Sequence, residues 1–208
     1  MPNHKDELKL ISETTLSHYN HNADSFWEGT RDHDVSQNIA ALLRHLDGEA
    51  PFSILDFGCG PGRDLITFSK LGHNATGLEG SHALAALARK HSNCDVWEQD
   101  FLELDLPEGV FDGVFANASL FHVPSVQLPS VLHSLHSTLQ SNGVLFASNP
   151  RGDNQEGWNG SRYGTYHDLE SWQAYLTDAG FTELEHYYRP EGLPRHQQPW
   201  LASVWRKS

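Results

Sequence analysis

Short apolar segments alternate with stretches of helical periodicity along most of this sequence. Five apolar runs predict buried strands, at 52–57, 75–78, 96–99, 111–116 and 143–148. Apolar residues spaced i, i+3, i+4 and i+7 predict amphipathic helices between and before these strands, at about 35–47, 63–71, 82–91 and 128–139. Strands that alternate with helices in this way are typical of an α/β fold with a mostly parallel sheet.

The C-terminal part of the chain follows a different pattern. Asp168 is expected to be the N-cap of a helix that Gly180 closes. Two strands with alternating polarity follow, at about 181–188 and 200–206, and they are expected to pair antiparallel. The predicted fold is therefore a Rossmann-like, seven-stranded, mostly parallel sheet with helices on both faces and a late antiparallel strand.

We expect a single domain built from four consecutive parts. Residues 1–50 are predicted to form an N-terminal helical cap, residues 51–149 the ligand-binding core, residues 150–167 a loop, and residues 168–208 a helix followed by a β-hairpin. The loop is rich in Gly and Asn, carries three aromatic residues and two arginines, and reads PRGDNQEGWNGSRYGTY from position 150. We expect it to close over the sheet's carboxyl edge as a lid.

Composition and charge narrow the range of partners. The chain has 208 residues, of which 38% are hydrophobic and 20% charged, and this is the composition of a globular protein. Lys and Arg number 14 against 27 Asp and Glu, so the formal net charge is −13. Because such an acidic surface repels phosphate, we expect neither a nucleic-acid nor a membrane partner.

Targeting signals and cysteine usage indicate the compartment. No apolar run approaches the ~20 residues that a membrane span needs. The first residues, MPNHKDELKLISETT, are polar and charged and do not resemble a secretory signal. Cys59 and Cys94 are too few for a disulfide framework. The expected location is the cytoplasm.

The strongest local motif directly follows the first predicted strand and reads DFGCGPG from Asp56 to Gly62. Its glycines allow a tight turn and the close approach of a ligand to the next helix N-terminus. Two further acids end the second and third strands, Glu79 and Asp100. A carboxylate at the end of the second strand suits two ribose hydroxyls, and Asp100 suits an adenine amino group. The alternative for each acid taken singly is a helix N-cap, but three acids at strand ends together favour a ligand site.

This arrangement resembles the class I S-adenosylmethionine (SAM) methyltransferases, in which such a turn holds a methionine moiety rather than a pyrophosphate. An acid is attractive beside an ammonium group and repulsive beside a pyrophosphate. The resemblance covers nearly the whole chain and makes residues 51–149 a SAM-binding core. It implies SAM as cofactor, S-adenosylhomocysteine as product, and these cofactor-binding residues: Tyr19, Asp56, Gly58, Gly60, Gly62, Arg63, Glu79, Gly80, Ser81, Asp100, Phe101 and Asn117.

Several longer strings resemble a narrower family, the methyltransferase domain at the C-terminus of ovothiol-forming 5-histidylcysteine sulfoxide synthases. They are FWEGTRDHDVSQN (26–38), ILDFGCGPGRD (54–64), FANASLFHVP (115–124), SNPRGDNQEGWNGSRYGTYHDLE (148–170) and YYRPEGLPRHQQPWLASVWR (187–206). The resemblance implies N-methylation of the imidazole of 5-thiohistidine to give ovothiol A. The chain has no room for the sulfoxide synthase part, so we expect a stand-alone or excised methyltransferase, functionally linked to a separate sulfoxide synthase.

Methyl transfer to 5-thiohistidine requires the ring nitrogen, rather than the softer sulfur, to face the methyl group. The catalytic candidates for this positioning and for base catalysis are Asn117, His122 and Tyr166. Arginines are candidates for the substrate carboxylate, and aromatic and amide groups for its ring, so the predicted substrate-binding residues are Trp27, Arg31, Arg151, Asn154, Trp158, Arg162, Tyr163 and Tyr166. The alternatives are core packing for the two tryptophans and solvated loop charges for Arg151 and Arg162.

Three other functions remain open at this point. One is a SAM-binding protein without turnover, and another is a methyltransferase for a different small substrate, such as a carboxylic acid or a metalloid. The third is a metal-binding module, because the chain contains 14 histidines. His133 and His136 have a suitable spacing but lie off the apolar stripe of their predicted helix, without a third ligand nearby, so no metal site is predicted.

Overall fold

A computed structural model describes residues 4–208 and shows one seven-stranded sheet. Its strand order is β3-β2-β1-β4-β5-β9-β8. The parallel strands are β1 (Ser53–Phe57), β2 (Asn74–Glu79), β3 (Asp95–Glu98), β4 (Phe111–Asn117) and β5 (Leu139–Pro150). Strand β9 (Trp200–Lys207) runs antiparallel to β5 and to β8 (Phe181–Arg189). The predicted Rossmann-like sheet with late antiparallel pairing is confirmed.

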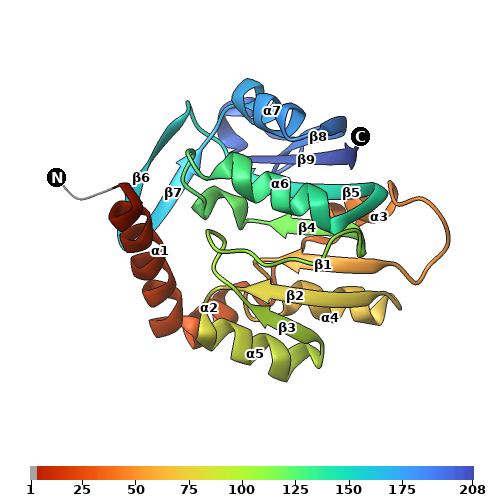
Figure 1. Ribbon diagram of the computed structural model, residues 1–208, viewed down its shortest axis with the longest axis horizontal. Coiled ribbons are helices and arrows are strands. Elements are labelled where there is room, and N and C mark those ends of the chain that lie inside the picture. The colour runs from red at the N-terminus through yellow and green to blue at the C-terminus, as the bar shows by residue number, and fades with distance from the viewer. Residues whose placement is uncertain (1–3) are drawn as a thin grey trace.

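Helices cover both faces of this sheet (Figure 1). One face carries α3 (Ser36–Leu43), α4 (Arg63–Lys70) and α5 (His82–Ser92), and the other carries α6 (Leu128–Thr138) and α7 (Leu169–Asp178). The strands serve both layers because successive side chains point to opposite faces. Ile54 and Leu55 of β1, both fully buried, thus belong to different core clusters. The predicted cap, residues 1–50, includes α3, which packs on the sheet.

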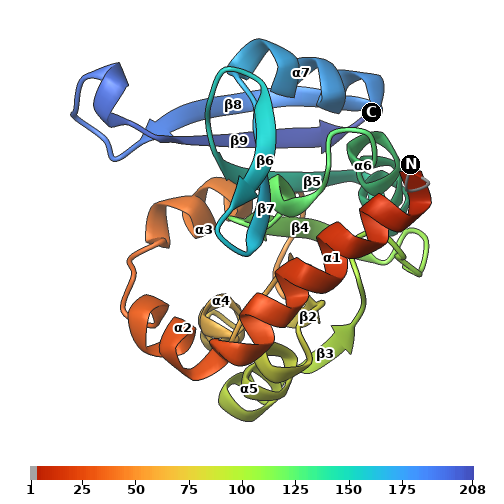
Figure 2. The same cartoon turned by 90° about the vertical axis from the view of Figure 1, so that its left-hand side faces the viewer.

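The strands β1 to β5 all end at the edge that faces the N-terminal helices. Helices α1 (His4–His21) and α2 (Ala23–Thr30) lie across this edge, as Figure 2 shows. Two short 3-10 helices, η1 (Leu120–His122) and η2 (Arg195–Gln197), lie in the connections after β4 and before β9. In an open α/β sheet, ligands bind at the carboxyl ends of the strands, so α1 and α2 cap the expected ligand site.

The predicted lid loop, residues 150–167, is instead largely a β-hairpin. Strands β6 (Gln155–Asn159) and β7 (Arg162–Tyr166) pair antiparallel and are joined by a two-residue turn. Gly160 supplies the positive φ, 61°, that such a turn requires. The prediction of a loop was wrong because the many Gly and Asn residues of this segment indicate irregular structure when taken alone. In the structure Gly160 lies in the turn, and the residues on either side of the turn pair as strands.

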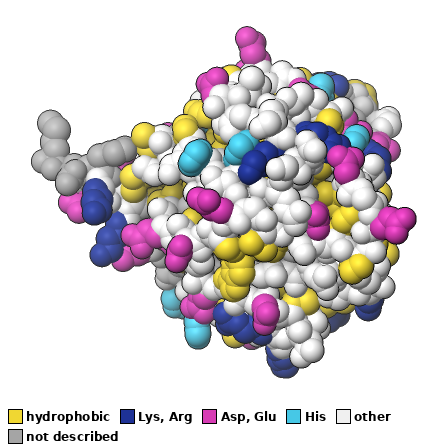
Figure 3. All heavy atoms as spheres, turned by 45° about the vertical axis from the view of Figure 1, so that its right-hand side comes forward, with side chains coloured by type: hydrophobic (Ala, Val, Ile, Leu, Met, Phe, Trp, Pro, Cys, Tyr) yellow, Lys and Arg dark blue, Asp and Glu magenta, His cyan; other side chains and the backbone are white. Residues whose placement is uncertain are grey.

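Charged side chains are distributed over the surface of the protein, in agreement with its composition. On the face shown in Figure 3, acidic and basic side chains lie intermingled with apolar ones. Among the described helices, none combines the length and apolar character that crossing a bilayer requires.

Asp168 caps α7 as predicted, since its side chain accepts a hydrogen bond from the Ser171 amide.

Candidate functional site

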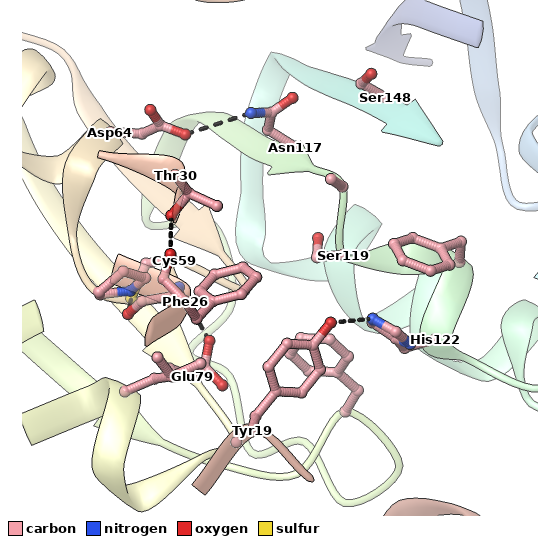
Figure 4. Close-up of a pocket in the computed structure, with 18 of the residues that line it drawn as sticks. Tyr19, Phe26, Thr30, Cys59, Asp64, Glu79, Asn117, Ser119, His122 and Ser148 are labelled. Carbon is pink, nitrogen blue, oxygen red and sulfur yellow. Dashed lines mark hydrogen bonds between the residues drawn. The ribbon is translucent and has the colours of Figure 1, made fainter. Parts of the chain in front are cut away.

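A cavity of about 590 Å³ opens at the carboxyl edge of the sheet, beneath the N-terminal helices (Figure 4). It is lined by residues from α1, the glycine-rich turn, the ends of β2 and β4, α3 and the hairpin. Nine of the twelve predicted cofactor residues line it, namely Tyr19, Gly58, Gly60, Arg63, Glu79, Gly80, Asp100, Phe101 and Asn117. Its volume lies within the range of about 300–1,000 Å³ that is typical of small-molecule sites.

The glycine-rich turn is shaped by close packing on both of its flanks. A Cβ atom on Gly58 would lie 2.4 Å from Cβ of Ser119, and one on Gly62 would lie 2.9 Å from the backbone Cα of Ala88. Gly62 is also the N-cap of α4 and has a φ of 92°. Gly60 has open space toward the cavity, where the nearest atom belongs to the ring of Phe26 at 3.5 Å. Gly62 therefore shapes the turn rather than the cavity wall.

Glu79 lies at the end of β2 with its carboxylate inside the turn. It accepts hydrogen bonds from the backbone amides of Gly60, at 2.9 Å, and Ser81, at 2.8 Å. Burial raises the pKa of this carboxyl to about 7, against the opposing effect of the amide hydrogen bonds. Since a carboxylate has about four acceptor sites, Glu79 keeps capacity for two ligand hydroxyls.

Asp56 does not lie where the motif predicts. It is buried at the end of β1, outside the cavity lining, and its Oδ2 has no hydrogen-bond partner within residues 4–208. Burial, with the nearby charge of Asp64, raises the pKa of the Asp56 carboxyl well above its usual range. Asp64, which the sequence did not single out, lines the cavity and pairs with Arg63 through Nε at 2.7 Å.

Helix α1 contributes to the end of the cavity that contains Asp100. The Ser12 hydroxyl donates to Asp100, whose other oxygen accepts from the Leu102 amide at 2.9 Å. Phe101 stacks on Phe57 with 4.3 Å between the ring centroids. Ser81 caps α5 through the Leu84 amide and does not line the cavity, so its role is local.

Tyr19 and His122 close one side of the cavity. The Tyr19 hydroxyl lies 2.8 Å from Nε2 of His122, and Nδ1 of His122 lies 2.7 Å from the carbonyl oxygen of Tyr163. A carbonyl only accepts, so Nδ1 carries the proton and Nε2 accepts from Tyr19. Burial lowers the pKa of His122 to about 4. The imidazole is therefore neutral at pH 7.

The opposite side of the cavity contains a chain of polar groups. Asn38 Oδ1 accepts from the Tyr187 hydroxyl, at 2.9 Å, and from Arg189, at 3.3 Å. The amide of Asn38 then donates to Asn117 Oδ1 at 3.0 Å, and Asn117 donates in turn to Asp64 at 3.4 Å. Both amide orientations follow from the acceptor-only carboxylate at one end. Figure 4 shows the Asn117–Asp64 contact above the turn.

Most predicted substrate residues lie away from the cavity. Arg162 lines it, whereas Tyr163 and Tyr166 from the same strand do not. Trp27 stacks on His91 with 4.3 Å between the ring centroids, and Trp158 is 47% exposed. Neither tryptophan lines the cavity, and the stacking of Trp27 on His91 agrees with the alternative that Trp27 serves packing.

The other arginine and amide candidates serve the local structure. Arg31 is exposed and pairs with Glu28 at 3.0 Å. Arg151 donates to the carbonyl oxygens of Gln198, at 2.7 Å, and Arg195, at 2.6 Å. Asn154 donates to Asp168 at 2.8 Å, at the start of α7. None of the three lines the cavity: Arg31 pairs within its own segment at the end of α2, and Arg151 and Asn154 bond to the chain that follows the hairpin.

Sequence reasoning missed Asn38, Asp64, Tyr187 and Arg189. All four lie within the long strings given above, and none of them stands in a short motif with a chemical signature. No cluster of three or more His, Cys, Asp or Glu side chains among residues 4–208 is suited to hold a metal ion.

The comparisons with known proteins agree on the fold. A family described as "Methyltransferase domain" matches residues 54–143, which is under half of the chain. No curated protein matches. The 1,6-didemethyltoxoflavin-N1-methyltransferase of Burkholderia thailandensis, solved with 1,6-didemethyltoxoflavin and S-adenosylhomocysteine, is 23% identical with a TM-score of 0.78, over 100% of this chain and 92% of that one.

Two further solved structures show the breadth of this fold. DhpI in complex with S-adenosylhomocysteine is 21% identical with a TM-score of 0.70, over 95% of this chain and 97% of that one. The [4+2]-cyclase SpnF is 16% identical with a TM-score of 0.68, over 82% of this chain and 80% of that one. The strand order, the glycine-rich turn and these likenesses lead to one conclusion. Residues 4–208 adopt the Rossmann-like fold of the class I SAM-dependent methyltransferases.

Proposed function

We propose that this protein is a SAM-dependent methyltransferase that acts on a small molecule. The observation that carries the proposal is the placement of Glu79 and Asp100 around one cavity with the glycine-rich turn. Support comes from the relatives solved with S-adenosylhomocysteine, one of which is an N1-methyltransferase of a small molecule. The cyclase on the same fold makes an activity test necessary, because fold alone does not determine the reaction.

The residues of the cavity fit SAM by their chemistry. Glu79 has acceptor capacity for the ribose hydroxyls, Asp100 for the adenine amino group, and Phe101 offers an apolar surface beside it. Gly60 leaves room for the ligand, since an added Cβ would meet only Phe26 at van der Waals distance. When bound, SAM supplies an electrophilic methyl group on a sulfonium. We assign Asp64, rather than Asp56, as the acid beside the ammonium group of SAM. Of these two acids, only Asp64 lines the cavity.

The finer proposal is that the methyl acceptor is 5-thiohistidine, methylated on the ring nitrogen next to the side-chain attachment to give ovothiol A. Its support is the similarity of the five long strings, all of which include residues lining the cavity, among them Asn38, Asn117 and Arg189. A separate sulfoxide synthase would then provide the precursor. Because the sulfur is the softer nucleophile, the protein has to hold the nitrogen in line with the methyl group.

The polar groups on the far side of the cavity are suited to this positioning. Asn117 has one amide hydrogen engaged by Asp64 and lies at the end of β4. We place Asn117 as the group that orients the acceptor ring. His122 is neutral and its Nε2 is occupied by Tyr19, so it orients Tyr19 instead of acting as a strong base. An acceptor nitrogen with a free lone pair needs no general base.

Methyl transfer from SAM to 5-thiohistidine, histidine and simple thiols, with products assigned by NMR, tests both levels of this proposal. We expect N-methylation of 5-thiohistidine with the sulfur left free, and a rate on histidine lower by about two orders of magnitude. Equal rates, or an S-methylated product, would overturn the 5-thiohistidine assignment. Calorimetric binding of SAM without turnover of any acceptor would favour a non-catalytic SAM-binding protein.

Glu79→Ala provides the control for the cofactor site. The variant loses two charge-assisted hydrogen bonds to the ribose, each worth about 1.5–3 kcal/mol. We therefore expect SAM binding to weaken by at least tenfold. An unchanged affinity would contradict the assignment of Glu79.

A further inference from the structure

Two arginines face the cavity without a carboxylate partner. The Arg–carboxylate ion pairs of residues 4–208 engage other arginines, namely Arg31, Arg44, Arg63, Arg89 and Arg206. Arg162 and Arg189 line the cavity and take part in none of these pairs. A half-buried guanidinium without a counter-ion pays a desolvation cost that an anionic ligand relieves. These two guanidinium groups therefore favour the binding of a negatively charged ligand group in the cavity.

The two arginines occupy different sides of the cavity. Arg162 lies beside the Tyr19 hydroxyl, where its charge lowers the pKa of that phenol against the larger effect of burial. Arg189 ends β8, and β8 is separated from the Glu79 strand by four strands in the sheet order. Arg189 thus lies on the side of the cavity remote from Glu79.

The surroundings of Arg189 hold it in place and leave most of its donors for a ligand. Its recorded hydrogen bond goes to the neutral Asn38 amide at 3.3 Å, and a guanidinium has five N–H donors. The nearby acid Asp34 is exposed, and its Oδ1 is engaged by the Ser36 amide at 2.9 Å. Asn38 is itself 4% exposed and fixed by Tyr187 and Asn117.

We propose that Arg189 binds a carboxylate of the methyl acceptor and thereby selects anionic substrates. This inference rests on the proposed methyltransferase function. The same hydrogen-bond chain joins Arg189 to Asn117 through Asn38, so an acceptor held by Arg189 at one end meets the orienting amide at the other. The protein's net charge of −13 repels anions at long range, and a local cation is what such a substrate needs.

Paired acceptors that differ by one carboxylate test this inference. The pairs are 5-thiohistidine and its decarboxylated amine, histidine and histamine, and imidazole-4-acetate and 4-methylimidazole. Methyl transfer from SAM is measured for each with the wild type, Arg189→Gln and Arg162→Gln. We expect the wild type to prefer the acid member, and Arg189→Gln to reduce this preference about 10- to 100-fold through KM. Arg162→Gln keeps the preference, and calorimetry shows unchanged SAM affinity in Arg189→Gln.

Each other outcome has a defined meaning. A wild type that prefers the neutral members, or methylates no acid, overturns the role of Arg189. So does loss of the preference in Arg162→Gln with its retention in Arg189→Gln. Preference for acids without turnover of 5-thiohistidine overturns the finer proposed function and supports the role of Arg189 as an anion-binding residue.

Discussion

The hydroxyl of Tyr19 lies 2.8 Å from Nε2 of His122, and this hydrogen bond joins helix α1 to the segment that follows β4. The two residues are 103 positions apart in the chain. Their contact is reinforced by the second bond of His122 to the hairpin carbonyl of Tyr163. One imidazole therefore connects the N-terminal helix, the core and the hairpin around the cavity.

The first prediction concerns this connection. Tyr19→Phe removes the donor and leaves Nε2 of the imidazole without a partner, which should lower the free energy of unfolding by about 1–3 kcal/mol. Urea denaturation measures the loss, and amide hydrogen exchange should accelerate in α1. Tyr163→Phe is the matched control, because His122 bonds to the backbone carbonyl of Tyr163, which this substitution keeps. Equal stability of Tyr19→Phe and the wild type would contradict the role of this bond.

A second prediction is the pH dependence that Glu79 imposes on the ligand-free protein. Its pKa is raised from 4.5 to about 7, so the folded state holds this proton more tightly than the unfolded state. The stabilising contribution is full below about pH 4.5 and is lost as pH rises through about 7. Glu79→Gln should flatten this fall, measured by urea denaturation from pH 4.5 to 8. Asp56 contributes with the same sign and remains in the variant.

The third prediction has the opposite sign in an overlapping pH range. The pKa of His122 is lowered from 6.5 to about 4, so its contribution is present above pH 6.5 and is lost as pH falls through about 4. His122→Gln keeps an acceptor for Tyr19 and removes the titration. Its stability should depend less on pH between about 4 and 6.5 than that of the wild type. A wild-type pH profile in this variant would show that His122 titrates normally.

The fourth prediction distinguishes the glycines of the turn. Gly62→Ala combines a φ of 92° with a Cβ 2.9 Å from the Ala88 backbone, and should destabilise by about 3 kcal/mol. Gly60→Ala meets only Phe26 at 3.5 Å and should cost about 1 kcal/mol while weakening SAM binding. Thermal unfolding and calorimetry separate the two effects. Equal destabilisation by both substitutions would contradict the different roles assigned to Gly60 and Gly62.

The fifth prediction contrasts Arg31 and Arg151, two arginines that the sequence analysis predicts to bind the substrate. Arg31→Gln removes an exposed ion pair and should leave stability and KM nearly unchanged. Arg151→Gln removes two charge-assisted bonds to the carbonyls of Gln198 and Arg195, and should increase hydrogen exchange over residues 190–199. A large rise in KM for Arg31→Gln would restore Arg31 as a substrate ligand.

The order and type of the core elements were determined by local sequence. Strand β1 and helix α4 follow from apolar runs and helical spacing, and the turn between them from glycines that adopt positive φ. The acids Glu79 and Asp100 were predictable for the same reason, because Glu79 ends β2, Asp100 follows the end of β3 by two residues, and the carboxyl ends of parallel strands meet at one edge.

Only the tertiary structure decided which polar side chains share the cavity. Asp56 and Asp64 both belong to the string of residues 54–64, yet the string alone does not indicate that Asp56 is buried outside the cavity lining while Asp64 lines the cavity. The hairpin shows the same limit, since pairing of β6 with β7 sends Arg162 to the cavity and leaves its tyrosine neighbour Tyr163 outside the lining.

The connection of Asn38 to Asn117 and Arg189 is the clearest case of what the sequence leaves undetermined. Asn117 and Arg189 lie 79 and 151 positions from Asn38, and the three residues belong to three different elements, β4, β8 and α3. Hydrophobic periodicity fixes which face of a helix or strand is buried, because burying apolar area is favourable wherever it occurs. It does not fix which polar groups meet, because hydrogen bonds depend on short distances and angles that exist only after the layers have packed. The sequence by itself therefore determined the layers and the ligand-binding edge, and the packing of those layers decided the substrate side of the cavity.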